Sequence, residues 1–281
     1  MKDNAMKRQC LPIISAVCSV LLLTSVSTAF ADKDSDGPRR GNITIDETNS
    51  WWQWAFAIPS SVHPLSLKSD DPTGKDYCMV GQHGSVWNLG GIFKVVDPIP
   101  ETTEAVTTET SDGIEPFVVV RECRVPLGTE ILIPVLNAEC NTAEEIMLDN
   151  LDPDASLEEK ITYLRDECVK PIADLITETE AFFGPEGSNL KKVKVQRVAT
   201  KVPFQVTFSP DNILNNEENE FSNPDPNPSL AFADGYWAKV TPKKTGTYVL
   251  KTYGVVPDFE FALDITYTIE VVVEGPGPIF E

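Results

Sequence analysis

Basic residues are scarce in this chain. Its 281 residues include 23 Lys and Arg against 43 Asp and Glu, which gives a formal net charge of −20. Nucleic acids and anionic lipid surfaces are bound through clustered Lys and Arg, so neither is expected as a partner. A solvated acidic surface explains this balance. Loosely bound Ca²⁺, for example at the acidic, Asn-rich stretch 211–228, or an extracellular ligand is the more specific alternative.

Signatures of common enzyme classes are also missing. The sequence has no G-x-S-x-G elbow, no phosphate-binding loop and no dinucleotide fingerprint. Ser60 and Ser61 are close to His63 in sequence, but the strand–turn–helix context that positions a serine nucleophile is absent. No C-x-x-C pair is present, which argues against a zinc site built from cysteines. We therefore expect no cofactor, and a divalent metal ion is the alternative.

Long apolar runs are confined to the N-terminus. A basic start precedes an apolar run at 11–23, and a small-residue site, Ala-Phe-Ala, follows at 29–31. This pattern predicts a signal peptide over residues 1–31, followed by a flexible polar leader at 32–41. A membrane anchor is the alternative, but Ser and Thr residues dilute the run. No later segment approaches the roughly 20 apolar residues that span a bilayer, so we expect no stable membrane insertion and a secreted or periplasmic protein.

Four cysteines remain after the signal peptide is removed, and an even number in an exported chain predicts two disulfides. These residues are Cys78, Cys123, Cys140 and Cys168. Three pairings are open. We favour Cys78–Cys123 with Cys140–Cys168, because each bond then ties a neighbouring strand or helix to the same sheet.

The most aromatic stretch predicts a short buried helix at about 51–58. Ser50 and Gln53 have capping-box spacing, and Pro59 ends the segment. Apolar side chains, including three tryptophans, surround the helix on nearly all sides, so it must be buried. A strand is expected to begin at 42–45.

Most of the remaining chain has the two-residue apolar alternation of β-strands. Strands are expected at 85–96, 116–125, 129–136, 193–198, 202–209, 235–240, 246–253 and 260–273. Helical periodicity returns only in the middle and predicts a helical insertion at about 142–183. Many strands without β-α-β alternation predict a mainly β fold, an antiparallel β-sandwich or jelly-roll-like domain. We place this single domain at 42–274 and a loose tail at 275–281.

Two candidate sites emerge. His63 and His83 are the only histidines, and with Glu139 they would complete two histidines and one carboxylate, the ligand set of open iron or manganese sites. The alternative is that each imidazole only satisfies nearby backbone groups. Trp237, in the block Asp-Gly-Tyr-Trp, is the candidate for a half-exposed, ligand-binding aromatic, with a core strand residue as the alternative.

Four ordered blocks carry a resemblance. Within residues 51–240, the chain resembles the successive blocks of a family of secreted, mainly prokaryotic proteins of uncharacterised function. The four blocks are WWQWAFAIPSSVHPL, CMVGQHGSVWNLGGIF, CRVPLGTEILIPVLNAEC and DGYW. The resemblance implies a shared domain with Cys78, Cys123 and Cys140 in matching positions, and it implies no activity. We therefore expect a non-enzymatic binding or envelope-associated protein of unknown specific role. The alternative is a jelly-roll metal-dependent enzyme that uses His63, His83 and Glu139.

Overall fold

A computed structural model describes residues 42–66, 71–92, 113–143, 151–152, 154–214 and 225–273. The predicted signal peptide (1–31), leader (32–41) and tail (275–281) lie outside these residues. All described residues belong to one compact unit, Asn42–Glu281.

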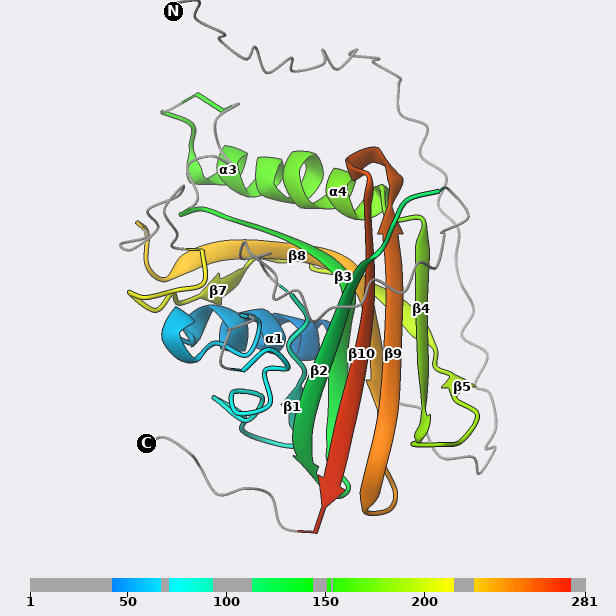
Figure 1. Cartoon of the computed structure of the whole chain (residues 1–281). Coiled ribbons are helices and arrows are strands. Elements are labelled where there is room, and N and C mark those ends of the chain that lie inside the picture. Colours follow the sequence, from blue (N-terminus) through cyan, green and yellow to red (C-terminus); the bar gives the residue numbers. More distant parts are fainter. Residues whose placement is uncertain are drawn as a thin grey trace, which may run out of the picture. The chain divides into compact units, whose positions relative to one another are not determined.

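Two five-stranded sheets form the body of the molecule (Figure 1). Sheet A has the strand order β1-β3-β8-β6, and β7 also pairs with β8. Its strands are β1 (Val86–Asn88), β3 (Glu130–Asn141), β6 (Val195–Ala199), β7 (Phe204–Val206) and β8 (Ser229–Val240). Sheet B has the order β2-β10-β9-β4-β5. Its strands are β2 (Phe117–Pro126), β4 (Glu178–Pro185), β5 (Lys191–Lys192), β9 (Gly246–Val256) and β10 (Phe261–Val272). The predicted mainly β, sandwich-like fold is confirmed.

The pairing is mixed rather than purely antiparallel. β1 runs parallel to β3, and β2 runs parallel to β10. The parallel pairing of β2 with β10 follows from two short connections that carry the chain from one sheet to the other. β2 and β3 are separated by the turn at 127–129, yet they belong to different sheets, and so do β8 and β9. Gly128 has φ +84°, which suits glycine at such a turn.

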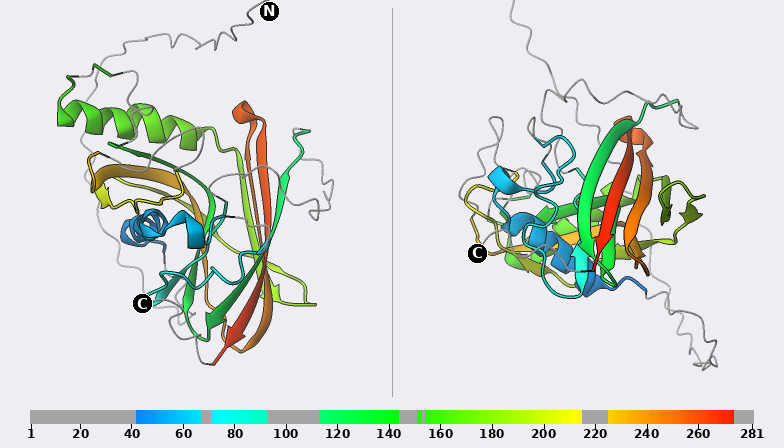
Figure 2. Two further views of the ribbon diagram at one scale, coloured as in Figure 1. Left: turned by 60° about the vertical axis from the view of Figure 1, so that its left-hand side comes forward. Right: turned by 60° about the horizontal axis from the view of Figure 1, so that its bottom comes forward.

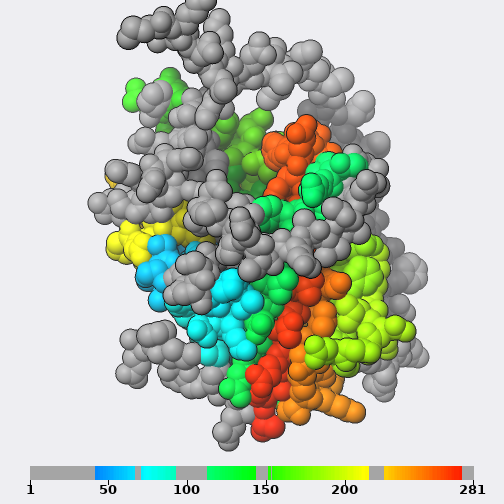
Figure 3. Space-filling view, viewed as in Figure 1, coloured from blue at the N-terminus to red at the C-terminus, as the bar shows by residue number. Residues whose placement is uncertain are grey.

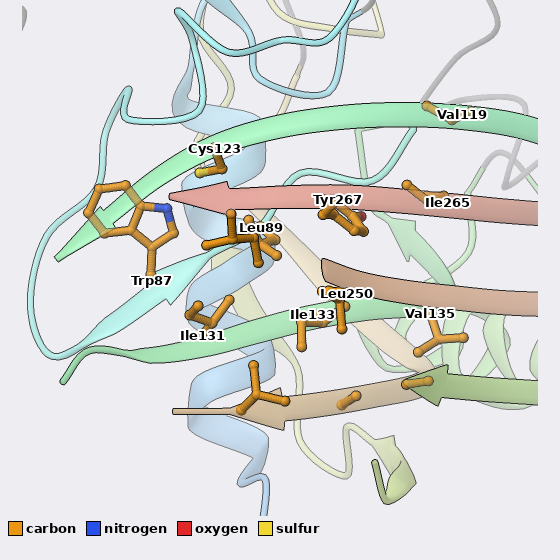
Figure 4. Packing of buried hydrophobic residues seen from close by; sticks show 14 of the residues in the cluster. Trp87, Leu89, Val119, Cys123, Ile131, Ile133, Val135, Leu250, Ile265 and Tyr267 are labelled. Atoms are coloured by element: carbon orange, nitrogen blue, oxygen red, sulfur yellow. The ribbon is translucent and has the colours of Figure 1, made fainter. Parts of the chain in front are cut away.

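Between the sheets lies the larger apolar core. Figure 4 shows that Ile131, Ile133 and Val135 of β3 face Tyr267 and Ile265 of β10. Successive strand residues point to opposite faces, and Leu132 accordingly packs in the cluster on the other face of sheet A. The register of β3 shifts between Pro134 and Leu136. This bulge puts both Val135 and Leu136 in the core between the sheets.

Helix α1 (Ile45–Ala57) covers the other face of sheet A (Figures 1 and 2). It begins earlier than predicted, and the expected strand at 42–45 is wrong. Thr44 and Glu47 form a complete capping box, which starts the helix ahead of the Ser50–Gln53 pair. The prediction of a buried, tryptophan-rich helix is confirmed, since Trp51, Trp52 and Trp54 are each at most 4% exposed.

The helical layer is shorter than the predicted insertion at 142–183. α3 (Leu157–Tyr163), the π-helical turn η2 (Leu164–Val169) and α4 (Lys170–Asp174) follow one another without a break, and Glu178 already begins β4. Phe182, inside the predicted helical insertion, lies on that strand. The reason is that the stretch 177–183 combines Thr and Phe residues that favour strands, and its Phe183 ring stacks on Tyr248 of β9 with centroids 5.1 Å apart.

Both disulfides have the favoured pairing. Cys78 joins Cys123 on β2, with Cα atoms 5.5 Å apart, so the segment before β1 is tied to sheet B. Cys140 joins Cys168 with Cα atoms 6.4 Å apart, so β3 is tied to η2. In Figure 3 the segment 71–92, in cyan, lies beside β2 and β10. In the part of the chain that the structure describes, no helix is long and apolar enough to cross a bilayer.

Candidate functional site: a cavity beside the free edge of β3

The predicted metal ligand His63 is fully buried and serves the backbone. Its Nδ1 accepts a hydrogen bond from Leu65 N–H at 3.0 Å. The other ring nitrogen, Nε2, therefore carries the proton and donates to the carbonyl of Ala55 at 2.6 Å. Both ring nitrogens are thus used to fix the turn that follows α1, which was the alternative interpretation of this residue.

The predicted three-residue metal site is not assembled. His83 lies on the surface, where its Nδ1 is 2.6 Å from the carbonyl of its neighbour Gly81. Glu139 lies on β3, where its Oε2 accepts from Asn141 Nδ2 at 3.5 Å. Among the described residues, which include all three candidates, no group of three or more His, Cys, Asp and Glu side chains is placed to hold a metal ion.

Trp237 is a core residue and not a half-exposed binding aromatic. Its side chain is 1% exposed and packs edge-on against Trp51 at a centroid distance of 5.4 Å. Successive side chains of β8 point to opposite faces of sheet A, and that of Trp237 points to the face that the tryptophans of α1 cover. The Asp-Gly-Tyr-Trp block therefore has a structural role here.

A cavity of about 400 Å³ lies beside β3. This volume falls within the range of small-molecule sites. The lining is largely apolar and comes from α1, β3, α4 and β10, together with Leu65, Gly91, Ile92 and Leu214. The lining residues are Trp51, Trp52, Leu65, Gly91, Ile92, Pro134, Val135, Leu136, Asn137, Ala138, Glu139, Ile172, Leu214, Phe261, Leu263 and Ile265. Figure 4 places Val135 and Ile265 at the end of the core opposite Trp87.

The shortness of β1 accounts for the position of the cavity. β1 pairs with β3 only as far as Leu132, and beyond that residue β3 pairs with β8 alone among the described strands. The chain leaves the edge of β3 at Gly90. A Cβ there would lie 2.9 Å from the carbonyl oxygen of Pro64, so only glycine allows this close approach. From Pro134 to Glu139, the free edge of β3 faces the cavity instead of a neighbouring strand.

Arg121 of β2 holds the departing chain in place. Its Nη2 donates to the carbonyl of Gly91 at 2.6 Å, and the hydroxyl of Tyr267 donates to the carbonyl of Gly90 at 3.2 Å. Arg121 is 3% exposed, and burial lowers its pKa to about 10. Burial has the opposite effect on Tyr267 and raises its pKa, because the charged form of a tyrosine is the deprotonated one. Neither Arg121 nor Tyr267 lines the cavity. Their hydrogen bonds fix the positions of Gly91 and Gly90, and Gly91 is one of the lining residues.

Asn137 is the polar residue that stands out in this apolar lining. Both amide atoms, Nδ2 and Oδ1, are buried and have no hydrogen-bond partner. Oδ1 lies over Gly235, its neighbour on β8. A Cβ at Gly235 would come within 2.5 Å of Asn137 Cα and 2.7 Å of the Leu136 carbonyl oxygen, which explains the glycine. An unsatisfied buried amide is costly, so Asn137 invites a functional explanation.

A second hollow, of about 500 Å³, lies between η2, α4 and strands β6 and β8. Its charges largely satisfy one another. Arg197 donates to both oxygens of Asp234, at 2.8 and 2.6 Å, and also contacts Asp174 at 2.7 Å. The hydrogen bonds that Arg197 donates to Asp234 raise the pKa of Arg197 despite its partial burial. Lys170 also pairs with Asp174. This network fastens α4 to sheet A.

Comparisons with known proteins do not identify a family. No family model and no curated protein matches the chain. Among solved structures, a family 123 glycoside hydrolase from Clostridium perfringens is 10% identical, with a TM-score of 0.24, over 56% of this chain and 23% of that enzyme. PbICP-C, solved in complex with falcipain-2, is 8% identical, with a TM-score of 0.23, over 67% of this chain and all of that chain. At these TM-scores neither similarity carries a conclusion.

The cavity and Asn137 were missed from the sequence. A signal was present, because Asn137 interrupts an otherwise apolar run in β3, Ile131–Ala138. Polar residues inside a core strand normally have partners, so a lone Asn in such a run indicates a candidate site residue.

Proposed function

We propose that this protein is a secreted or periplasmic, non-enzymatic binding protein that holds a small, mainly apolar molecule in the cavity beside β3. The observation that carries the proposal is the 400 Å³ volume with its largely apolar lining, which includes Asn137, whose amide lacks a hydrogen-bond partner. Apolar cavities with few, well-placed polar groups are the usual form of small-molecule sites.

The location outside the cytoplasm is supported by the two disulfides, which are typical of oxidising compartments. The resemblance of residues 51–240 to uncharacterised secreted proteins is part of the same proposal. Binding of Ca²⁺ at the acidic stretch 211–228 stays a prediction, because residues 215–224 lie outside the described part of the chain.

A binding assay with 1-aminoanthracene tests the proposal. This neutral aromatic probe becomes more fluorescent in apolar surroundings. We expect saturable binding of one probe per chain, accompanied by quenching of tryptophan emission, because Trp51 and Trp52 line the cavity.

Two matched variants locate the binding. Leu263 lines the cavity, so Leu263→Trp fills part of it and is expected to weaken probe binding about tenfold or more. Val120, on the neighbouring strand β2, is 46% exposed, and Val120→Trp is expected to leave binding unchanged. Absence of saturable binding, or equal affinity in the wild type and Leu263→Trp, would refute the proposal.

A further inference from the structure

We propose that the ligand of the cavity is a neutral amphiphile, an apolar chain with an amide or alcohol head group, and that Asn137 selects this head group. The inference rests on the proposed function and adds the chemical class of the ligand. It begins with Asn137, a residue of the cavity lining whose buried amide has no hydrogen-bond partner.

The amide of Asn137 offers one acceptor oxygen and two donor hydrogens. In the structure Oδ1 lies over Gly235, and neither amide atom is accessible. The proposal therefore includes a rotation about χ1 that brings the amide to the cavity whose lining contains Asn137. Since this rotation breaks no hydrogen bond of the amide, a head group that satisfies the amide can drive it.

The matching head group must both donate and accept. A carboxamide does so with two parallel hydrogen bonds to the Asn137 amide, and an alcohol does so through its single hydroxyl. The rest of the lining suits an aliphatic chain, since Leu263, Ile265 and Phe261 of β10 face it together with Trp51 and Trp52 of α1.

An anionic head group fits poorly. The described residues that line the cavity include no Lys, Arg or His, so a carboxylate finds no positive charge there. The one ionisable group in this lining is the carboxyl of Glu139, two residues from Asn137 on the same strand. A buried charge without a partner is strongly disfavoured. Fatty acids in their ionised form are therefore expected to bind weakly.

The test is a competition at pH 7.5 between bound 1-aminoanthracene and three ligands that share a ten-carbon chain: decanamide, decan-1-ol and decanoate. We expect the amide and the alcohol to displace the probe at concentrations about tenfold lower than decanoate does, a difference of about 1.4 kcal/mol. Asn137→Leu is expected to remove this preference, so that decanamide, decan-1-ol and decanoate displace the probe at similar concentrations.

Asn137→Gln retains an amide and is expected to keep part of the preference, which separates head-group recognition from a general disturbance of β3. Equal displacement by decanoate and decanamide, or an unchanged preference in Asn137→Leu, would overturn the inference while intact probe binding still supports a binding cavity. If the probe itself fails to bind the wild type, both the inference and the proposed function fail.

Discussion

Replacing Asn137 by Leu is expected to stabilise the protein, although most substitutions of buried residues destabilise. The variant keeps the branching at Cγ and removes two buried polar atoms that lack partners. Each such atom costs about 1–3 kcal/mol. The lower end for two atoms gives a gain of about 2 kcal/mol in the free energy of unfolding, before any gain from the added apolar contact in the cavity.

Thermal unfolding with the disulfides intact measures this gain. In a chain of this size, 1 kcal/mol changes Tm by about 2–4 °C, so Asn137→Leu should raise Tm by about 4–8 °C. Urea unfolding followed by tryptophan emission provides the free energy independently, through the midpoint at constant slope.

Asn212 offers a matched control with the opposite sign. It is fully buried, its Nδ2 donates to the Ser209 carbonyl and its Oδ1 accepts from Leu214 N–H, each at 3.0 Å. Asn212→Leu removes these bonds and should destabilise by about 1–3 kcal/mol. If Asn137→Leu is neutral or destabilises as Asn212→Leu does, the amide of Asn137 is satisfied in solution and the reasoning about it is refuted.

Three further predictions concern stability and burial. Burial acts to raise the pKa of Glu47, but hydrogen bonds from Lys239 and Thr44 outweigh this effect and lower the pKa. The contribution of Glu47 to the free energy of unfolding is therefore present above its ordinary pKa and is lost as the pH falls through the lowered pKa. Glu47→Gln should therefore destabilise the protein by about 1 kcal/mol at pH 7. In acid titrations of unfolding, its difference from wild type should shrink as the pH falls below the ordinary pKa of Glu47, 4.5, and a constant difference would contradict this. Each disulfide can be removed by a double Cys→Ser change and the loss of stability measured by urea unfolding. By loop-closure entropy, loss of Cys140–Cys168, which spans 28 residues, should cost about 3.6 kcal/mol, and loss of Cys78–Cys123, which spans 45, about 4.0 kcal/mol. Losses below about 1 kcal/mol would show that this entropic argument fails here. All five tryptophans are at most 8% exposed, so acrylamide should quench native emission weakly and denatured emission strongly, and strong native quenching would contradict the described core.

Local patterns in the sequence predicted much of the fold. Alternation located β2, β3, β9 and β10, and the encircling apolarity of α1 predicted its burial. The start of α1 was missed because two capping boxes compete, and the earlier one, with Thr44 and Glu47, has the acidic residue that completes it.

Partner choice between strands could not be predicted from local patterns. The short connection at 127–129 suits a hairpin as well as a crossing between sheets, and the choice depends on where distant strands lie. The same limit applies to the candidate site. His63 is used by Ala55 and Leu65, which only the folded turn brings to its ring. The cavity depends on the early end of β1, which the glycines near residue 90 allow.

The parallel pairing of β2 with β10 has a consequence for the order of folding. Val119 lies opposite Ile265, and β10 separates β2 from β9 in sheet B. Because synthesis proceeds from the N-terminus, β2 is made long before β10, its partner among the described strands of this sheet. Such distant pairing slows folding and leaves strand edges exposed meanwhile. A chain that stops before Phe261 would leave β2 and the adjoining edge of β9 open, so the last strand acts as the closing step for sheet B.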